Sequence, residues 1–243
     1  MTNKKFPQII IYLALIFGWG SLLLFGIFLY VGSFSLWNAG LTETKLLAVD
    51  AGLSLLFFIQ HSAMLRKSFR RQASLFIPKH YYAAFYAIVS GIALFIPMIL
   101  WQKSAISVME ATGYFRWLFR ILFVLSITGF IWGIRALGAF DPFGIKSIVN
   151  HLKNREPKIM PLAIRGPYRF VRHPLYFFML LMIWSCPDLT ADRLLFNVLW
   201  TLWVIVGTLL EERDLVHEFG EAYQNYQKKI PMLLPLKIFS RHS

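Results

Sequence analysis

Two short stretches of this 243-residue sequence combine residue types that could bind a charged ligand. The first reads RGPYRFVRHPLY, in which Arg172 and His173 directly precede Pro174. Proline is favoured at the first position of a helix, so free N–H groups of a helix start should point towards whatever lies beside His173. With Arg165, Arg169 and Arg172 nearby, this positive helix end favours a carboxylate or phosphate. An equally good alternative is that the three arginines contact lipid phosphates and that Pro174 only starts a helix.

The second stretch is the acidic pair Glu211-Glu212, which follows a long apolar run. Adjacent carboxylates at the end of a membrane span are costly unless they face a polar cavity or a cation. A helical hairpin between the two stretches would return the chain to its starting side and bring the pair near His173. Together the two stretches would suit a zwitterionic or cationic ligand. Alternatively, one glutamate forms a structural ion pair with Arg172 or Arg169.

The composition indicates that these stretches belong to a membrane protein. Apolar residues make up 57% of the chain and charged residues 15%, whereas soluble domains are about a quarter charged. The net charge of +13 could suggest a nucleic-acid partner, but the basic residues cluster in short loops between apolar runs. We therefore expect membrane lipids as partners and no nucleic acid.

Metal and disulfide sites are not expected. The single Cys186 excludes an intrachain disulfide and a multi-cysteine metal site, and the six histidines lack metal-ligand spacing on any one helix. The sequence as a whole favours no particular oligomeric state.

The apolar runs predict an all-α integral membrane protein with five to six transmembrane helices. The expected spans are 9–32, 46–64, 81–101 and 115–135, followed by a C-terminal helical hairpin at 175–187 and 194–210. A helix over 175–187 would reach only about 20 Å, which leaves open whether it crosses the bilayer.

After the hairpin, apolar residues recur at three- and four-residue steps and predict a cytoplasmic amphipathic C-terminal helix that ends before Pro231. They are Leu215, Phe219, Tyr223, Tyr226 and Ile230. Lysines and arginines lie in alternate connections, twenty on one side of the expected topology and five on the other. This bias predicts that both termini are cytoplasmic.

The stretches GPYRFVRHPLY and LEERDLVHEFGEAYQNYQKKIP closely resemble the isoprenylcysteine carboxyl methyltransferase-like superfamily of membrane methyltransferases. The resemblance covers residues 135–235. It implies that S-adenosylmethionine binds in a cytoplasmic pocket capped by the C-terminal segment. It also implies the cofactor-binding residues, which include a strand-like stretch at 161–163: Pro161, Leu162, Ala163, Tyr168, His173, Pro174, Leu175, Tyr176, Glu211 and Glu212.

The amino-terminal half looks most like the methanethiol S-methyltransferases and NnrU-like proteins of that superfamily. The supporting residues are Gln60-His61-Ser62, Asp141-x-Phe143-Gly144 and the basic run from Arg66 to Arg71. The resemblance implies two parts, with acceptor-side helices in 1–134 and the cofactor-binding loop, hairpin and cap in 135–243.

The expected activity is methylation of a small or lipophilic thiol, most simply of methanethiol to dimethyl sulfide. His61 is the candidate for assisting removal of the thiol proton, because ionisable residues in membrane spans are functional candidates. Methylation of a phospholipid amine or of a prenylcysteine carboxyl group on the same scaffold is an alternative. A non-enzymatic, NnrU-like accessory role is another.

Overall fold

The computed structural model describes residues 5–138, 140–156 and 162–235, and it confirms the all-α membrane fold. Among these described residues, five helices are long and apolar enough to cross a bilayer. They are α1 (Lys5–Val31), α2 (Glu43–Leu65), α4 (Lys79–Leu100), α5 (Gly113–Leu137) and α8 (Ala191–Phe219). The shorter elements are α3 (Lys67–Ala73), β1 (Ser107–Glu110), α6 (Ile145–Leu152), the 3-10 turn η1 (Gly166–Arg169), α7 (Pro174–Trp184), β2 (Asp188–Thr190) and α9 (Glu221–Lys229).

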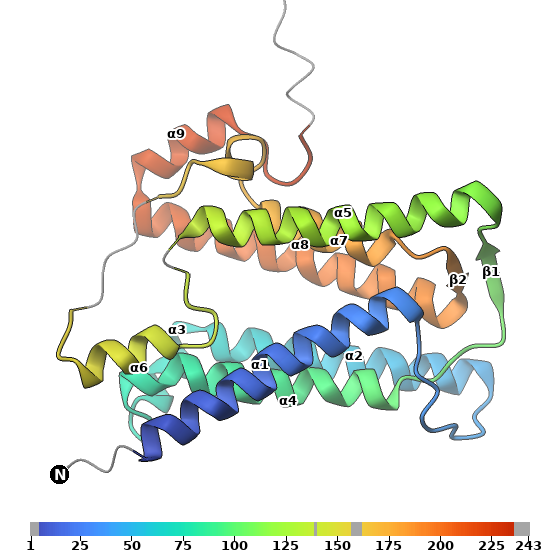
Figure 1. Cartoon of the computed structure of the whole chain (residues 1–243), viewed down its shortest axis with the longest axis horizontal. Helices are drawn as coiled ribbons and strands as arrows, with labels where there is room; N and C mark the ends of the chain where they lie inside the picture. The colour runs from blue at the N-terminus through green and yellow to red at the C-terminus, as the bar shows by residue number, and fades with distance from the viewer. Residues whose placement is uncertain (1–4, 139, 157–161, 236–243) are drawn as a thin grey trace, which may run out of the picture. The chain divides into compact units, whose positions relative to one another are not determined.

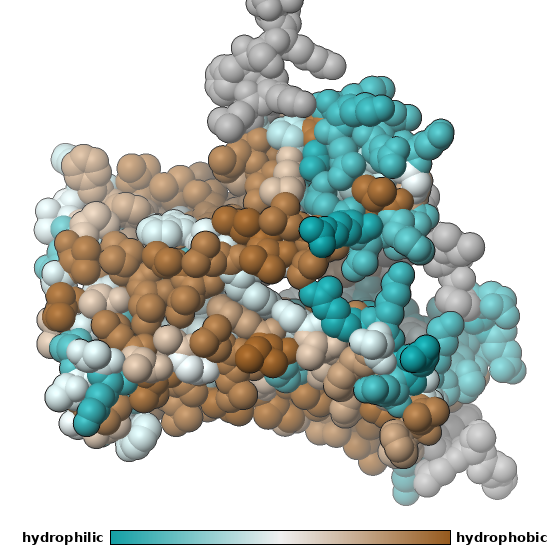
Figure 2. Space-filling model, turned by 180° about the vertical axis from the view of Figure 1, so that it is seen from behind, coloured by the Kyte–Doolittle hydropathy of each residue, from teal (hydrophilic) through white to brown (hydrophobic). Residues whose placement is uncertain are grey.

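Many large apolar side chains point outward from the long helices, as they do in proteins surrounded by lipid. Along α1 the exposed residues follow steps of three and four, as one stripe: Ile9, Tyr12, Ile16, Trp19 and Leu23. Figure 2 shows hydrophobic surface along the helices and hydrophilic groups gathered towards helix ends. This distribution supports burial of the helices in a bilayer.

The described residues form two compact units that interleave along the chain. One unit falls within Met1–Ile106, Asp141–Ile159 and Thr190–Phe196, and the other within Ser107–Phe140, Met160–Leu189 and Asn197–Ser243. These units do not follow the order of the chain. The assignment of 1–134 to the acceptor and 135–243 to the cofactor therefore stays a prediction.

In the first unit, α1 packs along α4, and α6 covers both (Figure 1). Phe143 is buried against Gly18 of α1, where a Cβ atom would overlap its ring. Gly144, with φ of +67°, passes so close to the backbone of Ala83 and Ala84 that no side chain would fit. Asp141 then accepts the amide N–H groups of the first turn of α6. The Asp-x-Phe-Gly element is thus explained by the docking of α6.

A buried polar cluster ties together helix ends in the same unit. Asp192, at the start of α8, accepts hydrogen bonds from the Trp101 indole and the Ser104 amide, both at 3.0 Å. Asp50 of α2 accepts the Gln102 amide at 3.0 Å. These carboxylates accept hydrogen bonds from N–H groups where α4 ends, so both buried acidic side chains have structural partners.

In the second unit, α5 packs along α7 through Gly129 and Gly133. A Cβ atom at Gly129 would overlap the Phe178 ring, and one at Gly133 would overlap the Leu175 side chain. The Gly-x-x-x-Gly spacing therefore creates the groove that receives α7. With only 11 residues, α7 rises about 16 Å, too little to cross a bilayer alone.

The C-terminal part differs from expectation in one respect. We expected one amphipathic helix after residue 210, but α8 continues to Phe219 and a separate helix, α9, begins at Glu221. The break falls at Gly220, whose φ of +55° is accessible to glycine at little cost. Helix α9 ends before Pro231, as predicted.

Candidate functional site

The start of α7 is shaped by the turn that precedes it. Gly166 has a φ of +57°, and a Cβ atom there would press on Ala136 and Trp132. Pro167 follows at the start of η1, and the chain then reaches His173, which directly precedes Pro174 of α7. The His173 side chain does not cap the helix, so its ring is available for other contacts.

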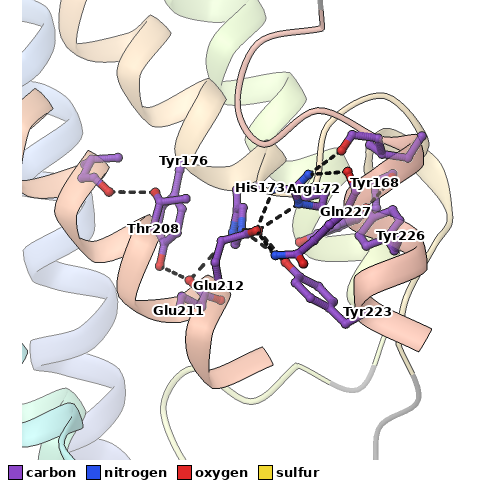
Figure 3. A network of polar contacts seen from close by, with 12 residues as sticks. Tyr168, Arg172, His173, Tyr176, Thr208, Glu211, Glu212, Tyr223, Tyr226 and Gln227 are labelled. Atoms are coloured by element: carbon purple, nitrogen blue, oxygen red, sulfur yellow. Dashed lines mark hydrogen bonds and ion pairs between the residues drawn. The ribbon is translucent and has the colours of Figure 1, made fainter. Parts of the chain in front are cut away.

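Glu212 of α8 is the centre of a buried polar network (Figure 3). Arg172 binds it at two points, with Nε–Oε1 at 2.9 Å and Nη2–Oε2 at 2.6 Å. The Nε2 atom of His173 lies 2.6 Å from Oε1, and Tyr223 Oη donates to the same oxygen at 2.6 Å. Gln227 Nε2 donates to Oε2 at 2.7 Å. The expected proximity of His173 and the acidic pair is confirmed, and so is the alternative of an ion pair with Arg172.

The network holds α9 against the start of α7. Tyr223 and Tyr226 of α9 are almost fully buried, and Tyr226 Oη donates to the Tyr168 carbonyl at 2.5 Å. The backbone N–H groups of Arg172 and His173 donate to the carbonyls of residues 231 and 232, at 2.9 and 3.1 Å. The segment after α9 therefore lies along the turn that leads into α7.

Burial and charge both act on the protonation of this network. Burial raises the pKa of the Tyr223 phenol above its ordinary value of 10.0, and the Glu212 carboxylate raises it further. Burial by itself lowers the pKa of the Arg172 guanidinium, but the hydrogen bond and charge of Glu212 outweigh it and raise that pKa overall. Tyr223 is therefore a neutral donor and Arg172 a cation at neutral pH.

Glu211 has a different environment from its neighbour. Tyr176 Oη donates to Glu211 Oε2 at 2.5 Å, and His173 Nδ1 lies 3.9 Å from the same oxygen. The Glu211 side chain is 43% exposed, whereas that of Glu212 is 10% exposed. Within the described part of the chain, no hydrogen bond reaches Glu211 Oε1. One oxygen of Glu211 is therefore open to a ligand.

Aromatic rings border this open carboxylate. The rings of His173 and Tyr176 lie nearly parallel, at 16°, with centroids 5.6 Å apart. A carboxylate beside aromatic faces attracts cations, and the first-turn N–H groups of Leu175 and Tyr176 have no partner within a helix. The arrangement fits a ligand that carries both an ammonium or sulfonium group and a carboxylate.

Several predicted site residues come together here, namely Tyr168, His173, Tyr176, Glu211 and Glu212 (Figure 3). Pro174 and Leu175 form the first turn of α7, where Leu175 packs against Gly133. Pro161 lies outside the described residues. Leu162 and Ala163 are partly buried and belong to no strand, so the prediction of a strand-like stretch is wrong for these two residues. The only strands among the described residues, β1 and β2, pair with each other.

The expected positive charge near His173 is corrected for one of the three arginines. The guanidinium of Arg172 is neutralised by Glu212, and Arg165 Nε donates to the Ala136 carbonyl. Arg165 and Arg169 are both exposed, and neither has an ion pair among the described residues. An anionic group would therefore be attracted by the start of α7 and by Arg165 and Arg169, but not by Arg172.

His61 belongs to the other unit, where it lies on α2. Its Nε2 atom is 2.7 Å from the hydroxyl of Tyr86 on α4, and its ring contacts Phe57. Gln60 donates to Met64 Sδ at 2.9 Å and to Ser90 Oγ at 3.4 Å. The pattern Gln-His-Ser thus supplies a polar cluster between two apolar helices.

Sequence reasoning missed the structural part of the site. Tyr223 and Tyr226 were assigned to an apolar face and to the stretch that carries the family resemblance, but not to the site, although their spacing after Gly220 could have indicated a docked helix. Nothing in the sequence distinguishes Gln227 as a donor to Glu212. Among the described residues, no group of three or more histidine, cysteine, aspartate or glutamate side chains could hold a metal ion.

These features define a helical membrane protein with a buried polar network and, beside it, a partly exposed carboxylate that could take a cationic or zwitterionic ligand. The phospholipid methyltransferase family profile matches residues 116–222, which contain this site. A methanethiol S-methyltransferase of Pseudomonas sp. (strain GM41(2012)) is 38% identical over 201 residues, 81% of this chain and 76% of that protein. Another, from Pseudomonas deceptionensis, is 36% identical, over 78% of this chain and 72% of that protein.

The chain therefore belongs to the membrane methyltransferase family that includes these methanethiol S-methyltransferases. A more distant relative is Nurim of Rattus norvegicus, 26% identical over 74% of this chain and 72% of that protein. No solved structure matches the chain.

Proposed function

We propose that this protein is an S-adenosylmethionine-dependent methyltransferase that methylates a small or lipophilic thiol, with methanethiol as the favoured acceptor. The observation that carries the proposal is the open carboxylate of Glu211 beside Tyr176 and His173. Relatives that are named methanethiol S-methyltransferases support the choice of acceptor.

S-adenosylmethionine supplies a methyl group on a positively charged sulfur. Glu211 would balance a positive charge of the cofactor, either the sulfonium or the ammonium of its amino-acid tail. The first-turn N–H groups of Leu175 and Tyr176 would face the carboxylate of that tail. The rings of Tyr168 and Tyr176 would offer aromatic faces to the cation. Glu212 would act indirectly, since its oxygens are occupied by Arg172, His173, Tyr223 and Gln227.

A thiol becomes a strong nucleophile once it has lost its proton. We propose that His61 assists this step, with the Tyr86 hydroxyl holding its imidazole in one orientation. The new sulfur–carbon bond would form as the bond between methyl and sulfonium breaks, and the thiol proton would pass to His61. Much of the rate should come from alignment of the acceptor with the methyl group.

The distribution of basic residues supports cytoplasmic termini. The Pseudomonas relatives support a bacterial inner membrane. We propose that residues 1–134 contribute the acceptor side and residues 135–243 the cofactor side. A second candidate activity is methylation of a phospholipid amine, which is favoured by the match to the phospholipid methyltransferase profile. Methylation of a prenylcysteine carboxyl group and a non-enzymatic, NnrU-like accessory role are the remaining alternatives.

The test is dimethyl sulfide detection in the headspace above purified protein with methanethiol and S-adenosylmethionine. The thiol proposal expects dimethyl sulfide that depends on both compounds, and no methylation of phosphatidylethanolamine. Methylated phosphatidylethanolamine without dimethyl sulfide would favour the second candidate. Calorimetric titration with S-adenosylhomocysteine separates an enzyme from an accessory protein, because a protein that has lost its cofactor site should give no saturable heat.

A further inference from the structure

A strongly basic segment joins α2 to α4, and nothing in the proposed methyl transfer uses it. Arg66, Lys67, Arg70 and Arg71 are all exposed, on or directly before α3. Residues 51–109 contain no aspartate or glutamate, and none of the ion pairs described involves these four residues. Their positive charge is therefore not neutralised by the segment itself.

Two exposed apolar side chains follow this basic helix. Leu75 is 78% exposed and Phe76 is 88% exposed. Together with Arg66, Lys67, Arg70 and Arg71 they form a surface that we call the α3 patch. Exposure of large apolar side chains to water is unfavourable, whereas these side chains are stable at the boundary between lipid headgroups and acyl chains.

The patch lies where two apolar helices end. Arg66 directly follows α2, and its amide donates to the Ala63 carbonyl at 3.1 Å as the chain turns into α3. The Arg70 guanidinium lies 5.5 Å from the centre of the Tyr82 ring on α4. Tyr82 Oη in turn donates to the carbonyl of Met64 near the end of α2. These contacts hold α3 at the level where α2 and α4 leave the apolar core.

We propose that the α3 patch binds the headgroup of an anionic phospholipid, with Leu75 and Phe76 inserted among the acyl chains. Basic residues immediately beside a transmembrane helix attract anionic lipids, and each contributes about fivefold to the affinity near the surface. Lys67 and Arg71 are four residues apart on α3, so they lie on one face of that helix. The apolar pair distinguishes a lipid from a free phosphate, which would gain nothing from it.

The experiment is native mass spectrometry of the full chain from nanodiscs that contain phosphatidylglycerol and phosphatidylcholine. Wild-type protein should retain phosphatidylglycerol preferentially. The double variant K67Q/R71Q should weaken this retention about tenfold or more, because it removes two charges from one helix face. It spares Arg70, which contacts Tyr82.

The matched control is K45Q/K103Q, which removes two exposed lysines beside the other ends of α2 and α4. This control should retain phosphatidylglycerol as the wild type does. Phe76→Ser should also weaken retention of phosphatidylglycerol, although it changes no charge. Unfolding temperatures in pure phosphatidylcholine check that each variant is folded.

Three results would overturn the proposal. The first is equal retention of phosphatidylglycerol and phosphatidylcholine by the wild type, which needs no variant. The second is equal loss of phosphatidylglycerol in K67Q/R71Q and K45Q/K103Q. The third is displacement of the lipid by millimolar inorganic phosphate without any effect of Phe76→Ser, which would indicate a simple anion site.

Discussion

Arg172 and Glu212 form a two-point ion pair in which each side chain is only 10% exposed. The pair joins the residue before His173 to the end of α8, forty positions later. Besides His173, the other donors to Glu212 come from α9, so one carboxylate connects three segments of the chain. Glu211, the adjacent residue, has an open oxygen instead. Two neighbouring glutamates thus have different environments, one structural and one open to a ligand.

Removal of Arg172 should destabilise the protein strongly. Arg172→Ala leaves Glu212 as a buried carboxylate without its cation, which typically costs about 3–5 kcal/mol. The measurement is the free energy of unfolding in micelles. Arg169→Ala is the control, because Arg169 is exposed, and it should change that free energy by less than about 0.5 kcal/mol. Equal effects of the two substitutions would show that the ion pair contributes little.

Glu211→Gln should weaken binding of S-adenosylmethionine about tenfold, because a charge-assisted contact is lost. Calorimetric titration measures this change. S-adenosylhomocysteine, which lacks the sulfonium charge, should be affected less if Glu211 faces the sulfonium and equally if it faces the ammonium. Glu218→Gln, on the exposed part of the same helix, is the control. Unchanged affinity in Glu211→Gln would remove Glu211 from the cofactor site.

The protein should lose stability above about pH 10, before the buried tyrosines ionise. The pKa of Tyr223 is raised by burial and by Glu212, so the phenol remains protonated in the folded protein while unfolded tyrosines, with a pKa of 10.0, ionise. Because the unfolded state then binds fewer protons, the free energy of unfolding falls as pH rises. The unfolding midpoint between pH 8 and 11 tests this. Tyr223→Phe should be less stable than the wild type at pH 8, but its unfolding midpoint should decline less as the pH rises. An identical decline in the two proteins would contradict the prediction.

Gly129→Ala should destabilise the packing of α7 on α5. The added Cβ atom overlaps the Phe178 ring, and overpacking of this kind costs about 1–3 kcal/mol. Gly207→Ala is a matched control in α8, because a Cβ atom there meets nothing within 4 Å. It should stabilise the helix by up to about 1 kcal/mol. Thermal unfolding of both variants provides the comparison, and a neutral Gly129→Ala would mean that α7 can shift away at no cost.

His61→Gln should slow thiol methylation at least about tenfold without a change in cofactor affinity, since proton transfer by a positioned side chain usually contributes more than that. Initial rates of dimethyl sulfide formation give kcat, and titration with S-adenosylhomocysteine gives the affinity. His80→Gln, at the start of α4, should leave the rate unchanged. Full activity of His61→Gln would assign the histidine to packing with Tyr86 and Phe57.

The fold class was accessible from the sequence because the bilayer imposes simple constraints. A helix that crosses lipid needs about 20 apolar residues, so α1, α2, α4 and α5 follow from composition and length alone. Pro174 and Pro231 likewise mark the start of α7 and the end of α9 through local backbone chemistry. The break at Gly220 was not predicted, because a glycine inside a helical pattern specifies an ending only when the following helix finds a surface on which to pack.

The amino-acid sequence by itself determined the apolar helices, their approximate ends and the residue types that meet near His173. Tertiary structure alone decided which glutamate is occupied: Arg172, Tyr223 and Gln227 converge on Glu212 and leave Glu211 half exposed. Adjacent residues on a helix point about 100° apart, so the same acidic pair turns one carboxylate into the protein and leaves the other partly exposed. Which of the two faces inward depends on how α7, α8 and α9 pack together, and no local pattern specifies that rotation.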